Sequence, residues 1–284
     1  MIASLSASSE MFLSDLNRVQ RRVDAAQRQI SSGLKVSAPS DAPDEIGSIL
    51  ELRAGLERNT QIQTNVTRVK AEVDTADATL QTVISLVERA KTLAAQGAGT
   101  MQDDSSRLAI DNEVESIQEQ LIALSQTTVQ GRPLFGGTMD ASREIEDPAG
   151  GSFPVARTLQ QVFDPRNPDG TPAADNVFAA VADLRAELQA NNPDGIQTAL
   201  DSLDAAGDHL NQQLGFYGAA QNRISDALDF AGKQAVQLKT SLSNLEDADV
   251  TSAILELSQA SVEQQAALAA QAKRPASTLF DYLG

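Results

Sequence analysis

The chain of 284 residues contains no cysteine and no tryptophan, and aromatic residues make up 4% of it. The lack of cysteine excludes disulfides, thiolate catalysis and cysteine-ligated metal sites. A compact core normally draws much of its burial from aromatic rings. So few rings therefore favour thin helical seams built from Leu, Ile, Val and Ala.

Basic charge and long apolar runs are also scarce. The formal net charge of −17 argues against a partner that presents phosphates, so we expect neither nucleic acid nor a membrane surface as a ligand. No stretch approaches the roughly 18 consecutive apolar residues that a membrane span needs. The first residues lack a basic segment followed by an apolar one, so we expect no cleavable secretory signal.

Groups that could carry out chemistry are few. The one histidine, His209, stands beside the seam position Leu210, and we expect it on the solvated edge of a helix. A single imidazole without cysteine predicts neither a zinc site nor a catalytic triad. The sequence therefore predicts no catalytic residues, no cofactor and no metal, and we expect a protein that is not an enzyme.

Apolar residues alternate at spacings of three and four, which indicates helices that pack along other helices. Unbroken or nearly unbroken seams run through 62–94, 110–128 and 196–245, and the last is too long for an ordinary globular helix. The N-terminal seam contains Ile2, Leu5, Phe12, Leu16, Val19, Val23 and Ile30, and the C-terminal one contains Val250, Ile254, Leu257 and Leu268. This pattern predicts long antiparallel helices.

Turn residues divide these helices. Gly33 suits the end of the first helix, and Ser40 or Asp41 is expected to cap a second helix over about 43–97. A third helix follows to about residue 128, and helix resumes near Asp175 and again over about 249–273. Between 131 and 172 the helical period is lost, and 153–155 and 159–163 are candidate strands.

The predicted fold is mainly α: a long antiparallel coiled-coil rod with a small β or irregular insert and paired terminal helices. The rod is assigned to 35–130 with 176–248, and the insert to 131–175. The terminal pair is assigned to 1–34 with 249–284.

Several motifs resemble the bacterial flagellin family. They are Gln29-Ile30-Ser31-Ser32-Gly33, Pro39-Ser40-Asp41-Ala42-Pro43, Arg89-Ala90-Lys91-Thr92-Leu93-Ala94-Ala95-Gln96 and Gly131-Arg132-Pro133-Leu134-Phe135-Gly136-Gly137-Thr138. Two further stretches are similar to the hook-associated members that join hook to filament: Leu245-Glu246-Asp247-Ala248-Asp249 and the closing Leu279-Phe280-Asp281-Tyr282-Leu283. The resemblance covers 1–138 and 176–284.

The resemblance implies a structural protein of the extracellular flagellum that is exported without a cleaved signal and polymerises through its terminal helices. Its expected partners are copies of itself or related flagellar subunits, hook-associated proteins, and an export chaperone at the C-terminal arm. The expected assembly interface consists of the terminal seam residues named above together with Leu279, Phe280 and Leu283.

Two alternatives to a junction subunit stay open. A compact filament flagellin would carry the same terminal seams. A long helical signalling or adaptor module would also carry long heptads, and it would differ in having both chain ends folded in dilute solution.

Overall fold

The computed structural model describes residues 2–99, 102–136 and 143–272, and for 2–8 it describes only the helical backbone. The chain forms two compact units. The middle unit spans 59–234, and the terminal unit combines 1–58 with 235–284. Helices α2 and α6 contribute to both units.

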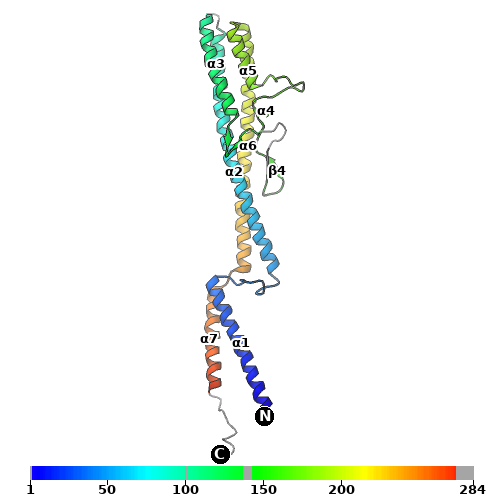
Figure 1. Ribbon diagram of the computed structural model, residues 1–284, viewed down its shortest axis with the longest axis vertical. Helices are drawn as coiled ribbons and strands as arrows, with labels where there is room; N and C mark the ends of the chain where they lie inside the picture. Colours follow the sequence, from blue (N-terminus) through cyan, green and yellow to red (C-terminus); the bar gives the residue numbers. More distant parts are fainter. Residues whose placement is uncertain (1, 100–101, 137–142, 273–284) are drawn as a thin grey trace, which may run out of the picture. The chain divides into compact units, whose positions relative to one another are not determined.

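Seven helices and four short strands follow one another in the described residues (Figure 1). The helices are α1 (Ile2–Ser32), α2 (Ile46–Gly97), α3 (Asp104–Ser125), α4 (Leu159–Val162), α5 (Val177–Gln189), α6 (Pro193–Glu246) and α7 (Val250–Ala272). The strands are β1 (Thr128–Val129), β2 (Arg132–Pro133), β3 (Glu144–Glu146) and β4 (Ser152–Pro154). The predicted mainly α class, with long helices, a small β insert and paired terminal helices, is confirmed.

In the middle unit, α2 and α6 run antiparallel, with α3 and α5 beside them (Figure 1). Every apolar step of the α2 seam from Val66 to Ala94 is buried, as the heptad pattern predicts. The facing positions on α6, among them Leu203 and Leu210, are buried in the same cluster. The middle unit therefore has one continuous apolar core.

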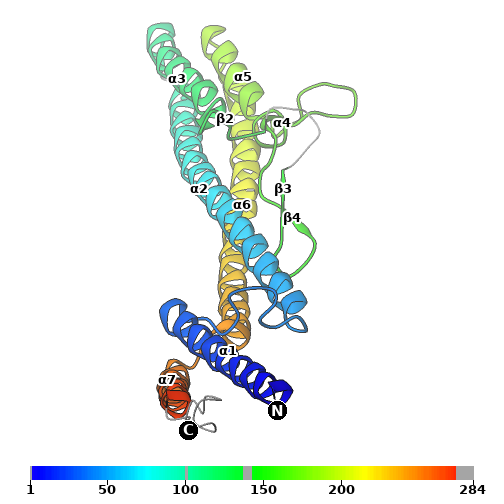
Figure 2. The same ribbon diagram turned by 60° about the horizontal axis from the view of Figure 1, so that its bottom comes forward.

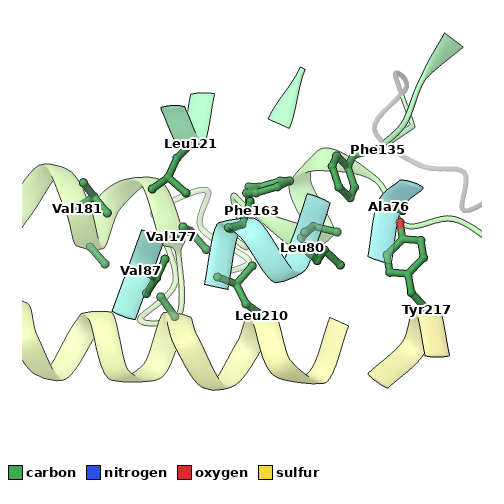
Figure 3. Packing of buried hydrophobic residues seen from close by; sticks show 14 of the residues in the cluster. Ala76, Leu80, Val87, Leu121, Phe135, Phe163, Val177, Val181, Leu210 and Tyr217 are labelled. Carbon is green, nitrogen blue, oxygen red and sulfur yellow. The ribbon is translucent and has the colours of Figure 1, made fainter. Parts of the chain in front are cut away.

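The insert is part of this core rather than a separate one. The rings of Phe135 and Phe163 meet edge to face with centroids 5.0 Å apart, over Leu80 of α2 (Figure 3). Tyr217 reaches from α6 toward Ala76, and its hydroxyl accepts a hydrogen bond from the Arg157 backbone N–H. Burial raises the pKa of this phenol. The insert thus adds the rings of Phe135 and Phe163 to a cluster that Tyr217 of α6 also joins.

The two β pairs are short hairpins. In the first, Thr128 pairs with Pro133, and the turn between the strands places Gln130 and Gly131 at positive φ. In the second, Ile145 pairs with Phe153, so the predicted strand at 153–155 is confirmed with bounds Ser152–Pro154.

The other predicted strand, 159–163, is wrong. This segment is the one-turn helix α4 because Thr158 and Gln161 form a capping box, in which each side chain bonds the other residue's backbone N–H. The third helix ends at Ser125 rather than near 128, since Thr128 begins β1.

The predicted cap of the second helix is also wrong. Helix α2 begins at Ile46, and the Asp41 carboxylate instead accepts hydrogen bonds from the backbone N–H groups of Ser37 and Ala38. The two prolines of this loop delay the helix beyond the first acidic residues. Asp41 therefore shapes the loop and does not cap the helix.

Candidate assembly surface

In the terminal unit, α1 and α7 lie side by side (Figures 1 and 2). The most buried side chains of the pair are Val19 and Ala26 on α1, and Ala253 and Ala260 on α7. Each set repeats at the heptad spacing, so it forms one stripe. Alanine lets two helices approach closely but buries little apolar area. The contact between α1 and α7 is therefore thin.

An ion-pair cluster spans the two helices beside this stripe. The Arg22 guanidinium lies with Nε 2.6 Å from Glu256 Oε1 and Nη1 2.5 Å from Glu263 Oε2. The hydrogen bond from Arg22 lowers the pKa of the Glu256 carboxyl, and the bonds to both carboxylates raise the pKa of Arg22. This cluster links α1 to α7 by exposed ion pairs beside the stripe.

The predicted interface residues on α1 fall on its α7 side. Val19 is buried, and the half-buried ones are Phe12, Leu16, Val23 and Ile30. The side chains of Ile2 and Leu5 lie outside the described residues, as do Leu279, Phe280 and Leu283.

The predicted interface residues on α7 behave differently. Leu257 is half-buried, but Val250, Ile254 and Leu268 are 42%, 52% and 50% exposed. Ile254 and Leu268 fall beside the buried alanine stripe, and Val250 continues that stripe at the first residue of α7. All three are large apolar groups left open to solvent. Exposed apolar side chains on one helix mark a surface that another protein can cover.

Sequence reasoning missed the alanine stripe of α7 and two more exposed apolar residues, Leu255 and Val262. The spacing of Ala253, Leu257 and Ala260 does alternate by four and three, so the signal was present. It was overlooked because alanine carries little hydrophobic signal beside the larger apolar residues of α7.

Motif residues that follow the end of α1 are hydrogen-bonded to motif residues that precede the start of α7. The Lys35 backbone N–H donates to the Glu246 carbonyl at 2.6 Å, and the Ala248 N–H donates to the Gly33 carbonyl at 2.9 Å. Gly33 has φ +72°, a conformation that glycine adopts without strain. Asp249 caps α7 by accepting from the N–H of Thr251 at 2.9 Å, and its hydrogen bonds to Ser252 and Thr251 lower its pKa.

His209 does not lie on a solvated edge, so that prediction is wrong. Its side chain is 13% exposed, with Nδ1 3.0 Å from Asp175 Oδ2 and Nε2 2.9 Å from the Gln161 carbonyl oxygen. The insert and the segment before α5 cover this face of α6, which the sequence pattern could not show. His209 connects three segments of the middle unit and has a structural role.

One groove of the middle unit offers no reactive group. Its volume is about 660 Å³, and it lies between β2 and α4, with Phe135 and Leu159 in its lining. The charged lining residues Asp164 and Arg166 pair with each other at 2.8 Å. Within 2–99, 102–136 and 143–272, no three His, Cys, Asp or Glu side chains are grouped to hold a metal ion. No helix of that described part has the length and hydropathy to span a membrane.

Two family models match the chain. That of the bacterial flagellin N-terminal helical region matches residues 3–140, and that of the bacterial flagellin C-terminal helical region matches 200–283. Flagellar hook-associated protein 3 of Salmonella typhimurium is 26% identical over 280 residues, which cover 86% of each chain. The flagellin of Halalkalibacterium halodurans is 21% identical over 272 residues, covering 95% of this chain and 93% of its own.

Solved structures share the fold. A putative flagellar hook-associated protein from Vibrio parahaemolyticus has a TM-score of 0.64 and 17% identity, covering 73% of this chain and 100% of its own. Bacillus cereus FlgL has a TM-score of 0.56 and 18% identity, covering 68% and 99%. The signalling or adaptor alternative loses its support. The chain belongs to the bacterial flagellin family and is an extracellular, non-enzymatic structural subunit of the flagellum that polymerises with other flagellar subunits.

Proposed function

We propose that this chain is the subunit that joins the flagellar hook to the filament. The observation that carries the proposal is the match to hook-associated protein 3 over 86% of both chains. The acidic stretch 246–249, typical of junction-type members, supports it because Glu246 and Asp249 both have structural roles at the base of α7. Filament flagellins match at slightly lower identity, and filament formation is the competing function.

In the assembled flagellum, the terminal segments 1–34 and 249–284 form the inner tube in this proposal. The segments 35–130 and 176–248 form the rod that sets lateral packing, and 131–175 lies outside. The exposed apolar residues Val250, Ile254 and Leu268 of α7 meet neighbouring subunits. Full burial of such a side chain contributes about 1.5–3 kcal/mol, so three half-exposed ones contribute a few kcal/mol per subunit.

Negative-stain imaging of the purified full chain under polymerising conditions separates the two functions. A junction subunit is expected to stay monomeric, because it needs the hook or its neighbouring proteins as a template. Long tubes formed by the chain alone would contradict the junction and favour a filament flagellin.

Introducing charged side chains on the exposed apolar residues of α7 tests whether they form the assembly surface. Ile254→Glu combined with Leu268→Glu places two carboxylates on the exposed stripe, where burial against a neighbour would desolvate them at high cost. We expect incorporation into flagella to be lost and the urea midpoint of the middle unit to be unchanged. Gln259→Glu adds charge to another exposed face of α7 and is the matched control. Normal incorporation of the double variant would reject this surface.

We also propose that an export chaperone covers the C-terminal arm before assembly. The support is that α7 presents large apolar side chains to solvent, Leu255 and Val262 among them, which an unassembled subunit would otherwise expose to aggregation. Co-purification of the chaperone with the full chain, but not with a chain that carries Leu255→Glu and Val262→Glu, is the expected result. Equal recovery with both chains would reject this binding site.

A further inference from the structure

The polypeptide passes between the terminal helices and the long helices twice, and the two passages are bonded to each other. Leu34 pairs with Asp247 in an antiparallel bridge. The N–H groups of Lys35 and Ala248 donate across this bridge, to Glu246 and Gly33 respectively. Because both bonds involve backbone groups, neither passage can shift along the other without breaking them.

The same place holds a buried charge. The side chain of Glu246, the last residue of α6, is 7% exposed, and its Oε1 lies 2.6 Å from Nη2 of Arg53 on α2. A carboxylate with this little contact with water needs a charged partner. Arg53 therefore does more here than a surface cation does, since its removal leaves a buried charge without its counter-charge.

Two apolar side chains in the same segments are buried. They are Val36, two residues after the bridged Leu34, and Ile49 in the first turn of α2. The bridged backbone, the ion pair and these two apolar side chains thus join the end of α1, the start of α2, the end of α6 and the approach to α7. We call residues 33–36, Arg53 and 246–248 the joint.

We infer that the joint is a mechanical coupling element, and that the Arg53–Glu246 pair sets its stiffness. The Glu246 carbonyl accepts a hydrogen bond from the Lys35 N–H, and the Glu246 carboxylate pairs with Arg53 of α2. One residue therefore connects the bridged backbone to the long helices. Displacement of α1 or α7 is thereby transmitted to α2 and α6 instead of being absorbed by flexible connectors. This inference depends on the chain being a flagellar subunit and not on its being a junction subunit.

The test is amide hydrogen exchange on the full-length free subunit, followed at Lys35 and Ala248. Arg53→Met leaves the buried Glu246 carboxylate without its counter-charge, which favours opening of the joint, so we expect exchange at both amides to be at least about tenfold faster. Glu246→Gln keeps the shape and an acceptor, so its effect should be smaller. Amides in the middle unit, such as that of Leu210, should be unchanged.

Lys35→Met is the matched control. It removes the Lys35–Glu45 pair, whose atoms are 3.4 Å apart and whose side chains are 49% and 39% exposed, yet it leaves the bridge intact. We expect less than a twofold change at Ala248. Unchanged exchange in Arg53→Met, or an equal change in the Lys35→Met control, would overturn the inference.

A second readout concerns assembled flagella. Arg53→Met subunits are expected to incorporate normally, because the exposed stripe of α7 is untouched, but the flagella should break at lower shear than those of the control. Normal incorporation with unchanged shear resistance would overturn the mechanical role. The exchange measurement uses the free subunit, so its result does not depend on where in the flagellum the subunit is placed.

Discussion

The middle and terminal units differ in what they bury. The middle unit buries rings and large aliphatic side chains, Tyr217, Phe163 and Leu80 among them. They form one cluster to which four helices and the insert contribute residues. Between α1 and α7 the most buried positions include Ala26, Ala253 and Ala260, and large apolar side chains remain exposed. The middle unit has enough apolar burial to fold from its own residues. The pair α1 and α7 of the terminal unit has little apolar burial to offset the entropy of ordering two helices.

This difference separates stability from assembly. A unit whose core is complete gains little from a neighbour. A pair of helices with an incomplete interface gains from any surface that covers it, because binding to the folded form alone stabilises that form. We therefore expect changes in the middle core to alter unfolding, and changes between α1 and α7 to alter polymerisation.

The largest effect is expected in the ring cluster. Phe135→Ala removes a buried ring that contacts Phe163 and Tyr217, with ring centroids 5.0 Å and 6.4 Å away, and should lower the free energy of unfolding by about 3–5 kcal/mol. Urea unfolding followed by circular dichroism measures the loss. Phe230→Ala, at a phenylalanine that is exposed in the same unit, is the control and should cost far less. Equal losses would mean that the insert does not complete the core.

The next effect tests the terminal unit. Ala260→Leu adds three carbons at a position that is 0% exposed between α1 and α7, and overpacking of this kind costs about 1–3 kcal/mol. Because that interface is thin, we expect the α1–α7 pair to open and incorporation into flagella to fail, with the urea midpoint of the middle unit unchanged. Ala266→Leu, on an exposed face of α7, is the control. A shift in the middle unit's midpoint would contradict the separation of the two units.

A smaller loss is expected at His209. His209→Ala removes contacts to Asp175 and the Gln161 carbonyl and should cost about 1–3 kcal/mol. Faster amide exchange should appear in α4 and before α5, the segments that the imidazole holds. Asp208→Asn changes the exposed neighbour and should leave both segments unaffected. Unaltered exchange in the His209 variant would show that the insert is held without it.

The helical seams were predictable because burial along a coiled coil repeats with a period that the residues themselves show. The α2 seam is the clearest case, since its apolar positions are buried from Val66 to Ala94. The insert was less predictable. Its short apolar runs fit strand or turn equally well, and α4 was decided by the Thr158 capping box rather than by periodicity.

The assembly surface was predictable in part. The terminal seams locate the right helices, but the side of α7 that α1 covers depends on alanines that carry little hydrophobic signal. The partners of Arg22 lie on a helix at the other end of the chain, so no local pattern identifies them. The same holds for Arg53 and Glu246 in the joint, which α2 and α6 bring together only on folding.

The smallest expected effect is a response of the terminal pair to acid. Arg22 holds the pKa of Glu256 below its ordinary value of 4.5. A carboxyl whose pKa is lowered in the folded state stabilises that state above its ordinary pKa, and this contribution is lost as the pH falls through the lowered pKa. The α1–α7 pair should therefore loosen below about pH 4.5, with little change between pH 5 and pH 8 from this source.

Because the chain has no cysteine, this loosening can be measured with two spin labels introduced at Gln27→Cys on α1 and Gln259→Cys on α7, both of which are exposed. The distance distribution should be narrow at neutral pH and broaden at about pH 3. With Glu256→Gln added, the distribution should already be broader at neutral pH and should change less with acid, because one of the two carboxylates of the Arg22 cluster no longer titrates. A narrow distribution at both pH values would show that the alanine stripe holds the two helices together without the Arg22 cluster. The terminal unit would then be more firmly paired than its small apolar burial predicts.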